Sequence, residues 1–232
     1  EAIGFRPQDA QCLFTLAIVL RICGHPAEAV KAYNMVLDII PNHPIAASNA
    51  AFDQSLTYAT QKELLSQRQR WHAEHSYKGE IAAHLNDKSP NRPLRVGYVS
   101  GDFRLHSASL MFANVILRHT DAVEVYLYST RRQGDWEDEH TAAFKAKACD
   151  RWRDIAGVGD SEADKIIRND RIDILVDLSS YTGFGRLPLF TRKSAPIQVT
   201  AWGFATGTGC PEIDYFFADR IVAPEEDRQY YA

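Results

Sequence analysis

Cysteine is scarce in this 232-residue sequence, and its four copies show no C-x-x-C spacing (Cys12, Cys23, Cys149 and Cys210). This arrangement argues against a zinc site and against the disulfide framework of small secreted proteins. No stretch approaches the roughly 18–20 apolar residues that a membrane span requires, and no signal peptide is visible. A reducing cytoplasm is therefore the expected compartment. Since residue 1 is glutamate and not methionine, we expect part of the natural N-terminus to be missing.

The sequence also lacks an excess of charge of one sign. Its formal net charge is −4, with 45% hydrophobic and 24% charged residues, which is an ordinary composition for a globular protein. Such a balance does not predict electrostatic binding to nucleic acid. The length suffices for one large or two small domains.

The first 58 residues carry the signs of a helical repeat. Pro7 and Pro41 lie 34 positions apart, which is the period of the tetratricopeptide repeat (TPR). Two apolar stripes at helical spacing lie between them, joined by a turn at Gly24-His25-Pro26 (Leu13, Leu16, Ala17, Leu20; Ala29, Tyr33, Val36, Leu37). We interpret residues 1–58 as a TPR region, with Pro44–Ser55 as the first helix of a degenerate further repeat. The alternative is an unrelated helical hairpin.

A helix and a linker are expected over residues 59–93. Thr60–His75 has the pattern of an amphipathic helix, and Thr60 with Glu63 resembles a capping box. Tyr77–Pro93 is polar and is interrupted by glycine and proline, which is typical of a linker.

From residue 94 to residue 232 apolar strands alternate with helices. The expected strands are Leu94–Ser100, Val123–Thr130, Arg151–Ile155, Ile172–Leu178, Pro196–Trp202 and Asp214–Ala218. The expected helices are Ser109–His119, Glu137–Ala148, Ser161–Asp170 (with Ser161 as N-cap) and Arg186–Thr191. This alternation predicts an α/β Rossmann-like domain, whose parallel sheet is covered on both faces.

Three polar turns follow strands of this sheet, and ligands bind at the carboxyl ends of parallel strands. The turns are Ser100–His106, Ser179–Arg186 and Gly203–Gly209. The first presents an acid and an imidazole, Asp102 and His106, as a candidate acid/base pair. The second follows Asp177 and contains Tyr181, Thr182 and Arg186. The third is rich in glycine and threonine, which lets a sugar or phosphate approach the backbone closely.

Each of these residues also has a structural interpretation. Asp102 can cap the next helix, and His106 can be a surface histidine in a turn. Asp177 can bind N–H groups of the loop, and Arg186 can be a solvated helix residue. The Gly203–Gly209 loop lacks the lysine of a P-loop. No G-x-G-x-x-G opens the first turn, which argues against an epimerase or dehydrogenase that binds a dinucleotide.

Taken in order, these motifs resemble one known family. A TPR region followed by LRVGYVSGDFRLH, DRIDILVDLSSYTG and APIQVTAWGFATGTG is similar to the catalytic region of O-GlcNAc transferases and SPINDLY-type fucosyltransferases. The resemblance implies the first half of a GT-B fold, in which two Rossmann-like lobes hold a nucleotide sugar between them. It also implies sugar transfer to Ser or Thr of proteins, with UDP-GlcNAc as the expected donor. Neither a metal nor a bound cofactor is implied, and the TPR region would select the acceptor protein.

The resemblance assigns roles to individual positions. His106 and Asp102 match the family's D-F-x-x-H motif, whose members were proposed as proton acceptors. Tyr181, Thr182 and Arg186 fall on its G-Y/H-T-x-x-x-R stretch. Gly203 matches the first glycine of the G-Y-P-G-T-S-G loop that lines the sugar pocket.

Three departures qualify the resemblance. Relatives carry a histidine between the last repeat and the catalytic lobe, whereas the matching region Asp53–Tyr58 has none. Ala205 stands where many relatives have proline, which bears on donor-sugar preference. No second lobe follows, so we expect a fragment or a degenerate member of the family. The competing hypothesis is a non-catalytic TPR adaptor, and no motif indicates an oligomeric state.

Overall fold

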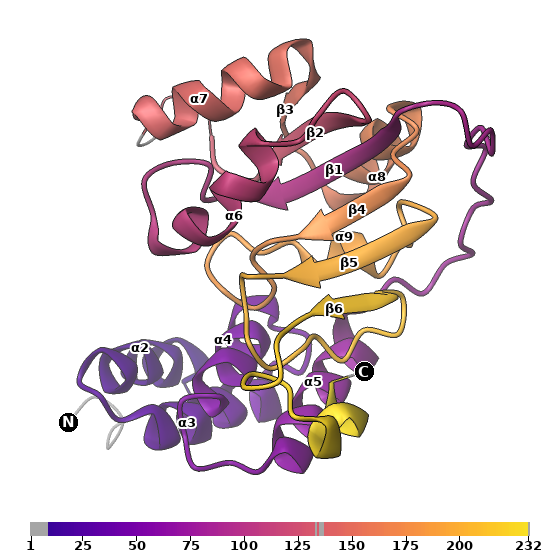
Figure 1. Cartoon of the computed structure of the whole chain (residues 1–232). Helices are drawn as coiled ribbons and strands as arrows, with labels where there is room; N and C mark the ends of the chain where they lie inside the picture. Colours follow the sequence, from indigo (N-terminus) through magenta and orange to yellow (C-terminus); the bar gives the residue numbers. More distant parts are fainter. Residues whose placement is uncertain (1–8, 133, 135–136, 232) are drawn as a thin grey trace. The chain divides into compact units, whose positions relative to one another are not determined.

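The computed structural model describes residues 9–132, 134 and 137–231, and it divides the chain into two compact units (Figure 1). A helical unit contains the chain up to Ser76 together with Thr208–Cys210 and the stretch from Ala223 onward. An α/β unit contains Tyr77–Gly207 and Pro211–Val222. The predicted boundaries at residues 58 and 93 therefore differ from the observed ones. The helix after residue 60 joins the repeat helices, and the linker joins the α/β unit.

Within the described residues, the helical unit contains four α-helices, α2 (Ala10–Ile22), α3 (Pro26–Ile39), α4 (Pro44–Gln54) and α5 (Gln61–His75), and the 3-10 helix η2 (Glu225–Tyr230). Asp9 caps α2 with its carboxylate, while proline occupies the first position of α3 and α4. The capping box predicted for Thr60 and Glu63 is present at the start of α5. These local signals explain why each helix begins where it does.

Small residues line the interfaces of this unit. Ala17 and Ala29 are fully buried, so α2 and α3 approach closely, as the repeat pattern predicts. Tyr33 is also fully buried, and its hydroxyl accepts a hydrogen bond of 3.1 Å from Asn49 of α4. The helical hairpin is thus confirmed. Pro7, one of the two prolines that define the period, lies outside the described residues.

The α/β unit contains one parallel sheet of six strands, with the bounds β1 (Leu94–Ser100), β2 (Val123–Ser129), β3 (Trp152–Asp154), β4 (Ile174–Asp177), β5 (Ile197–Ala201) and β6 (Tyr215–Phe217). Their order in the sheet is β3-β2-β1-β4-β5-β6, and every neighbouring pair is parallel. This is the order of a Rossmann fold, in which the direction of winding reverses between β1 and β4.

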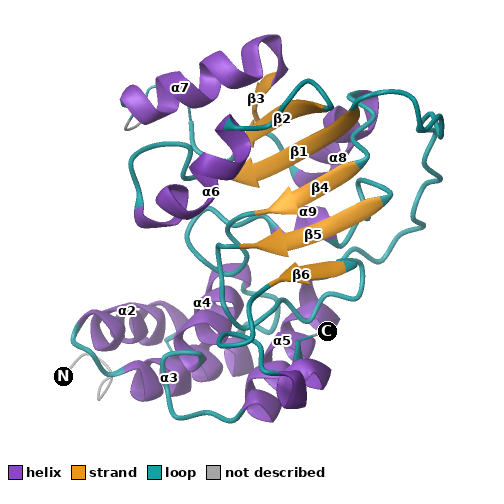
Figure 2. Ribbon diagram, in the orientation of Figure 1, coloured by secondary structure: helices purple, strands orange, loops and turns teal. Residues whose placement is uncertain are grey.

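Helices cover both faces of the sheet (Figure 2). On one face α6 (Ser107–Leu117) and α7 (Glu139–Ala148) bury Phe112, Ile116 and Phe144 against the strands. On the other face α8 (Asp160–Asn169) and the short α9 (Leu187–Phe190) bury Ile167 and Phe190. The buried aliphatic and aromatic residues of β1, β2 and β4 lie between these two layers. The predicted fold class is confirmed.

Some predicted details are wrong. Gly159, and not Ser161, is the N-cap of α8, because the helix begins at Asp160 and no side chain caps it. Residues 77–93 contain neither helix nor strand, as expected of a linker, but they are fixed to the α/β unit. The Asn86 amide donates to the carbonyls of Arg171 and Ile172, and Arg92 pairs with Asp173 at 2.7 Å.

Candidate active site

The three predicted turns meet at one edge of the sheet. The hydroxyl oxygens of Ser100, the last residue of β1, and Ser179, which follows β4, lie 3.4 Å apart. The Thr130 hydroxyl, which follows β2, donates to the carbonyl of Phe184 at 2.7 Å. The carboxyl ends of β1, β2 and β4 are therefore joined directly, at the position where the winding reverses. A doubly wound sheet binds its ligands at this position.

Asp102 lies at the centre of this edge and is buried. Its backbone N–H donates to the Ser100 hydroxyl at 2.9 Å, which fixes the turn. Three nitrogen atoms surround its carboxylate beyond hydrogen-bond range: Arg104 Nε at 3.8 Å, His106 Nδ1 at 3.7 Å and Arg131 Nη2 at 3.8 Å. The structure thus brings the predicted pair Asp102 and His106 together and adds two arginines that the sequence did not single out.

His106 is the N-cap of α6, so the alternative that Asp102 caps this helix is wrong. The ring Nδ1 of His106 accepts a hydrogen bond of 3.3 Å from the Ala108 backbone N–H. The backbone N–H of His106 donates to the Ser109 hydroxyl at 3.2 Å. A neutral imidazole that accepts at one nitrogen carries its proton on the other. In this arrangement Nε2 is a hydrogen-bond donor, and the side chain is about two-fifths exposed.

Asp177 has the structural role that was considered for it. Its carboxylate accepts hydrogen bonds from the N–H groups of Ser179 and Ser180 and from the Thr200 hydroxyl. Complete burial raises the pKa of Asp177, although these three hydrogen bonds lower it in part. The carboxylate holds the β4 turn in shape, including the left-handed backbone of Ser180 at φ 48°.

Arg186 is bound within the protein. Its Nε donates to Asp160 Oδ1 at 2.8 Å, and its Nη1 donates to the carbonyl of Ile155 at 2.9 Å. The guanidinium therefore ties the β4 turn to the first residue of α8 and to the loop that precedes this helix. These internal hydrogen bonds explain the position of Arg186 without any ligand. Its role in binding the sugar donor stays a prediction.

Tyr181 and Thr182 lie in the same turn. Tyr181 is buried, and its ring meets that of Phe204 edge to face with centroids 5.7 Å apart. The Thr182 hydroxyl donates to the carbonyl of Ser179 at 2.5 Å. Both residues shape the turn, and ligand contacts of either one stay predictions.

Gly203 is needed for a close approach between two strand ends. A Cβ atom at this position would lie 2.1 Å from the carbonyl oxygen of Leu178, far inside van der Waals contact. Only glycine lets the β5 end pass over the end of β4 in this way. Trp202, immediately before it, has a left-handed backbone with φ 59°.

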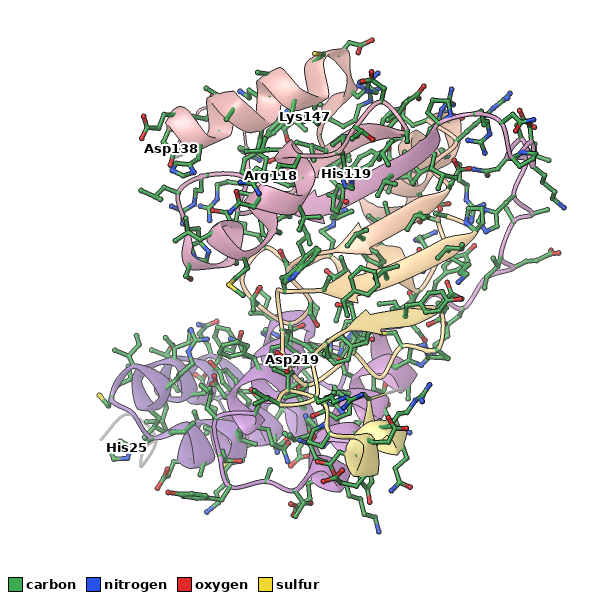
Figure 3. The ribbon with its side chains drawn as sticks, in the orientation of Figure 1. His25, Arg118, His119, Asp138, Lys147 and Asp219 are labelled. Atoms are coloured by element: carbon green, nitrogen blue, oxygen red, sulfur yellow. The ribbon has the colours of Figure 1, made fainter. Side chains whose placement is uncertain are left out.

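An apolar pocket of about 410 Å³ opens beside the Gly203 loop. It is lined by one residue of α6, by the end of β5 and by β6 with its following turn (Met111, Trp202, Phe204, Ala205, Phe216, Phe217, Ala218, Asp219 and Val222). Figure 3 labels Asp219, the charged residue of this lining, just after β6. The volume of this apolar pocket is within the range of small-molecule sites. Of these residues, only those of the Gly203 loop were expected, because Trp202 and Phe216 look like ordinary strand residues in the sequence.

Among the described residues, no group of three or more His, Cys, Asp or Glu side chains is arranged to hold a metal ion. None of the described helices combines the length and apolarity of a membrane span.

The sequence of this chain is similar to proteins of one family. The model of Glycosyl transferase family 41 matches residues 71–232. The probable UDP-N-acetylglucosamine–peptide N-acetylglucosaminyltransferase SPINDLY of Solanum lycopersicum is 36% identical over 146 residues, or 62% of this chain and 16% of that protein. The corresponding probable enzyme SEC of Arabidopsis thaliana is 34% identical over 140 residues, or 60% of this chain and 14% of that protein.

A solved structure resembles nearly the whole chain. It is a mutant form of the O-GlcNAc transferase of Thermobaculum terrenum, with a TM-score of 0.88 and 30% sequence identity. The match covers 99% of this chain and 44% of that one, so the chain spans less than half the length of its relatives. The family model covers more than half of the sequence and includes every turn of the candidate site. This chain belongs to glycosyl transferase family 41.

Proposed function

We propose that the protein containing this chain is a protein O-glycosyltransferase, which moves a sugar from a nucleotide-sugar donor to Ser or Thr hydroxyls of proteins. The observation that carries the proposal is the position of Asp102 and His106. Their side chains lie 3.7 Å apart at the point where the sheet reverses its winding, in a member of family 41. The expected donor is UDP-GlcNAc, in keeping with the names of the related enzymes.

The chemistry requires one bond to form and one to break. The acceptor oxygen bonds to the anomeric carbon, the bond between that carbon and the diphosphate breaks, and the hydroxyl proton leaves. Neither a carboxylate nor an imidazole is a strong enough base to remove that proton completely beforehand, so proton transfer must accompany bond formation. His106 Nε2–H is suited to donate a hydrogen bond to a substrate oxygen, while Asp102 is suited to accept a proton through a relay.

The apolar pocket beside Gly203 is the proposed place of the donor sugar. Its aromatic residues offer flat apolar surfaces, such as Trp202 and Phe217, whose rings meet edge to face at 6.1 Å. The nucleotide is expected to gain further contacts from a second lobe of the full-length protein. The TPR region is the proposed contact for the acceptor protein.

Nucleotide-sugar binding by the full-length natural protein tests the proposal. We expect one donor from a panel of UDP- and GDP-linked sugars to bind, and its sugar to appear on Ser or Thr of a co-purified protein when followed by mass spectrometry. An adaptor without catalytic function would bind none of the panel. That result, obtained with folded full-length protein, would reject the transferase.

A further inference from the structure

Two arginines beside Asp102, Arg104 and Arg131, have N–H groups that can donate further hydrogen bonds. Among the described residues, Arg104 Nε is buried without a hydrogen bond, and its nearest acidic oxygen is the Asp102 carboxylate at 3.8 Å. Arg131 is held in place from two sides. Its Nε donates to the carbonyl of Gly101 at 3.0 Å, and its guanidinium stacks on the Phe184 ring at 3.9 Å. Its Nη2 lies 3.8 Å from Asp102. Both guanidinium groups thus lie at the pocket with N–H donors available for a ligand.

These arginines line a small pocket beyond the carboxyl ends of β1, β2 and β3. Arg132 adds a third guanidinium, and the other lining residues that matter here are Trp152, Asp154 and Glu137. Glu137 is already paired with Lys145, whose Nζ lies 2.7 Å from Oε1. Against these three arginines stand two further carboxylates, that of Asp154 in the pocket lining and that of Asp102 beside Arg104 and Arg131. The pocket keeps an excess of positive charge.

The size of the pocket restricts what can enter it. Its volume of about 20 Å³ is room for one or two water-sized groups. The two oxygen atoms of a carboxylate meet this limit and match the fork of a guanidinium, while a sugar ring or a whole diphosphate exceeds it. An oxyanion at the tip of a flexible side chain is the ligand that fits both the charge and the space.

We propose that this pocket binds the carboxylate of an Asp or Glu side chain of the acceptor protein, close in sequence to the hydroxyl that receives the sugar. The proposal rests on the proposed function, because it supposes a protein acceptor. Arg104 is two residues from both Asp102 and His106, so a carboxylate bound here anchors the acceptor beside the candidate site. Arg104 and Arg131 are then determinants of acceptor specificity.

Peptide binding to the full-length protein, without any nucleotide sugar, tests the proposal. The probes are fluorescent Ser-centred peptides in matched pairs, which carry Glu or Gln at each of the three positions on either side of Ser. Fluorescence anisotropy gives the Kd of each. At one position we expect the Glu peptide to bind about tenfold more tightly than its Gln partner, as a charge-assisted hydrogen bond allows.

The Arg104→Gln variant should reduce this preference to less than about twofold, while Arg104→Lys, which keeps the charge but loses the fork, should keep part of it. Arg104→Glu should reverse it in favour of a Lys peptide. The matched control is Arg118→Gln, because Arg118 is exposed and follows the opposite end of α6 from His106 (Figure 3). Melting temperatures verify that each variant folds. Equal Kd values for Glu and Gln peptides at every position, or a preference that survives in Arg104→Gln, would overturn the proposal.

The phosphate of the donor is the other source of an oxyanion, and a separate titration distinguishes it. UDP-GlcNAc should bind wild type and Arg104→Gln equally. Weaker binding of UDP-GlcNAc by the variant, with an unchanged peptide preference, would assign the arginines to the donor and overturn the proposal. A preference for Glu peptides in a protein that binds no donor would instead reject only the proposed transferase activity.

Discussion

At the scale of single residues, the hydrogen bond from Ala108 to His106 Nδ1 has the clearest chemical consequence. It uses the lone pair nearer to Asp102, so the ring presents an N–H and not a lone pair at Nε2. A histidine held in this way is suited to donate a hydrogen bond to a negatively charged oxygen, which is the role we propose for His106. To act as a base at Nε2, the ring would have to give up its hydrogen bond to the helix terminus.

Two substitutions at His106 separate these roles. We expect His106→Ala to lower the rate of sugar transfer by the full-length protein at least about 10²-fold. His106→Gln should retain about tenfold more activity than the alanine variant, because the glutamine amide can donate from a position near Nε2. Steady-state kinetics with the donor identified in the binding screen provide the measurement. Equal loss in both variants would favour a base, and wild-type turnover in His106→Ala would exclude either role.

Asp53 is a second residue whose environment has a measurable effect. Its carboxylate is completely buried in the helical unit, and neither oxygen has a hydrogen-bond partner among the described residues. Arg21 is its nearest counter-charge at 4.0 Å, and burial raises the pKa of Asp53 to about 6. The raised pKa means that the folded state binds the proton more tightly than the unfolded state does. Asp53 is therefore compatible with folding when protonated and opposes folding when ionised.

The stability of the helical unit should consequently fall as the pH rises from about 4 to about 6. The loss is complete above the folded pKa and amounts to roughly 2–3 kcal/mol. Asp53→Asn, an isosteric neutral side chain, should remove this dependence and raise the melting temperature at pH 7. Thermal unfolding of both proteins between pH 4 and pH 8 gives the difference. Parallel pH profiles for the two proteins would contradict the assignment.

At the scale of secondary-structure elements, the ends of the strands are more restrictive than their middles. Gly203→Ala would place a methyl group 2.1 Å from the backbone oxygen of Leu178, and backbone cannot move aside as a flexible side chain can. We expect this variant to destabilise the α/β unit by more than about 2 kcal/mol. Urea unfolding gives the free energy.

Gly183→Ala is the matched control, since a Cβ at Gly183 meets nothing within 4 Å and its φ is not positive. That variant should be neutral or slightly stabilising, because it restricts the unfolded chain. Similar stability of the two variants would mean that the β5 end does not pass over β4 as described.

The same elements show what the sequence could predict. Strands such as β1 and β4 could be predicted from their apolar residues, because they are buried on both faces of the sheet. Helices could be predicted from their apolar spacing and from capping residues such as Asp9 and Thr60. The start of α8 was misplaced because a serine near a helix start resembles a cap. In the structure the helix begins at Asp160, whose carboxylate accepts a hydrogen bond from Arg186, a residue 26 positions away. Local patterns contain no information about such a partner.

The candidate site divides in a similar way. Asp102 and His106 could be predicted because strand, turn and helix follow one another in the sequence. Arg131 could not, since its guanidinium is held by the Phe184 ring, which belongs to another turn. Arg104 lies in the same turn as the pair, but no local pattern shows that its Nε is buried without a hydrogen bond. The apolar pocket depends likewise on the pairing of β5 with β6. Residues that come together only through the sheet order are not visible in a single sequence.

At the scale of the whole molecule, the two units are interleaved along the chain. The α/β unit occupies one nearly continuous stretch, whereas the helical unit takes residues from both sides of it. The boundary between units therefore could not be found from a change in composition. Buried Arg68 of α5 illustrates the arrangement, because its Nη2 donates to the carbonyl of Tyr230 at 2.6 Å.

This interleaving sets an order of events during synthesis. Arg68 leaves the ribosome 162 residues before the carbonyl to which it binds. At a translation rate of about 5–20 residues per second, the nascent α5 waits on the order of 10–30 s for that partner. The whole α/β unit is translated within this interval. The part of the chain that is made second can thus finish folding first, and the helices made first are completed by residues that emerge only after the α/β unit.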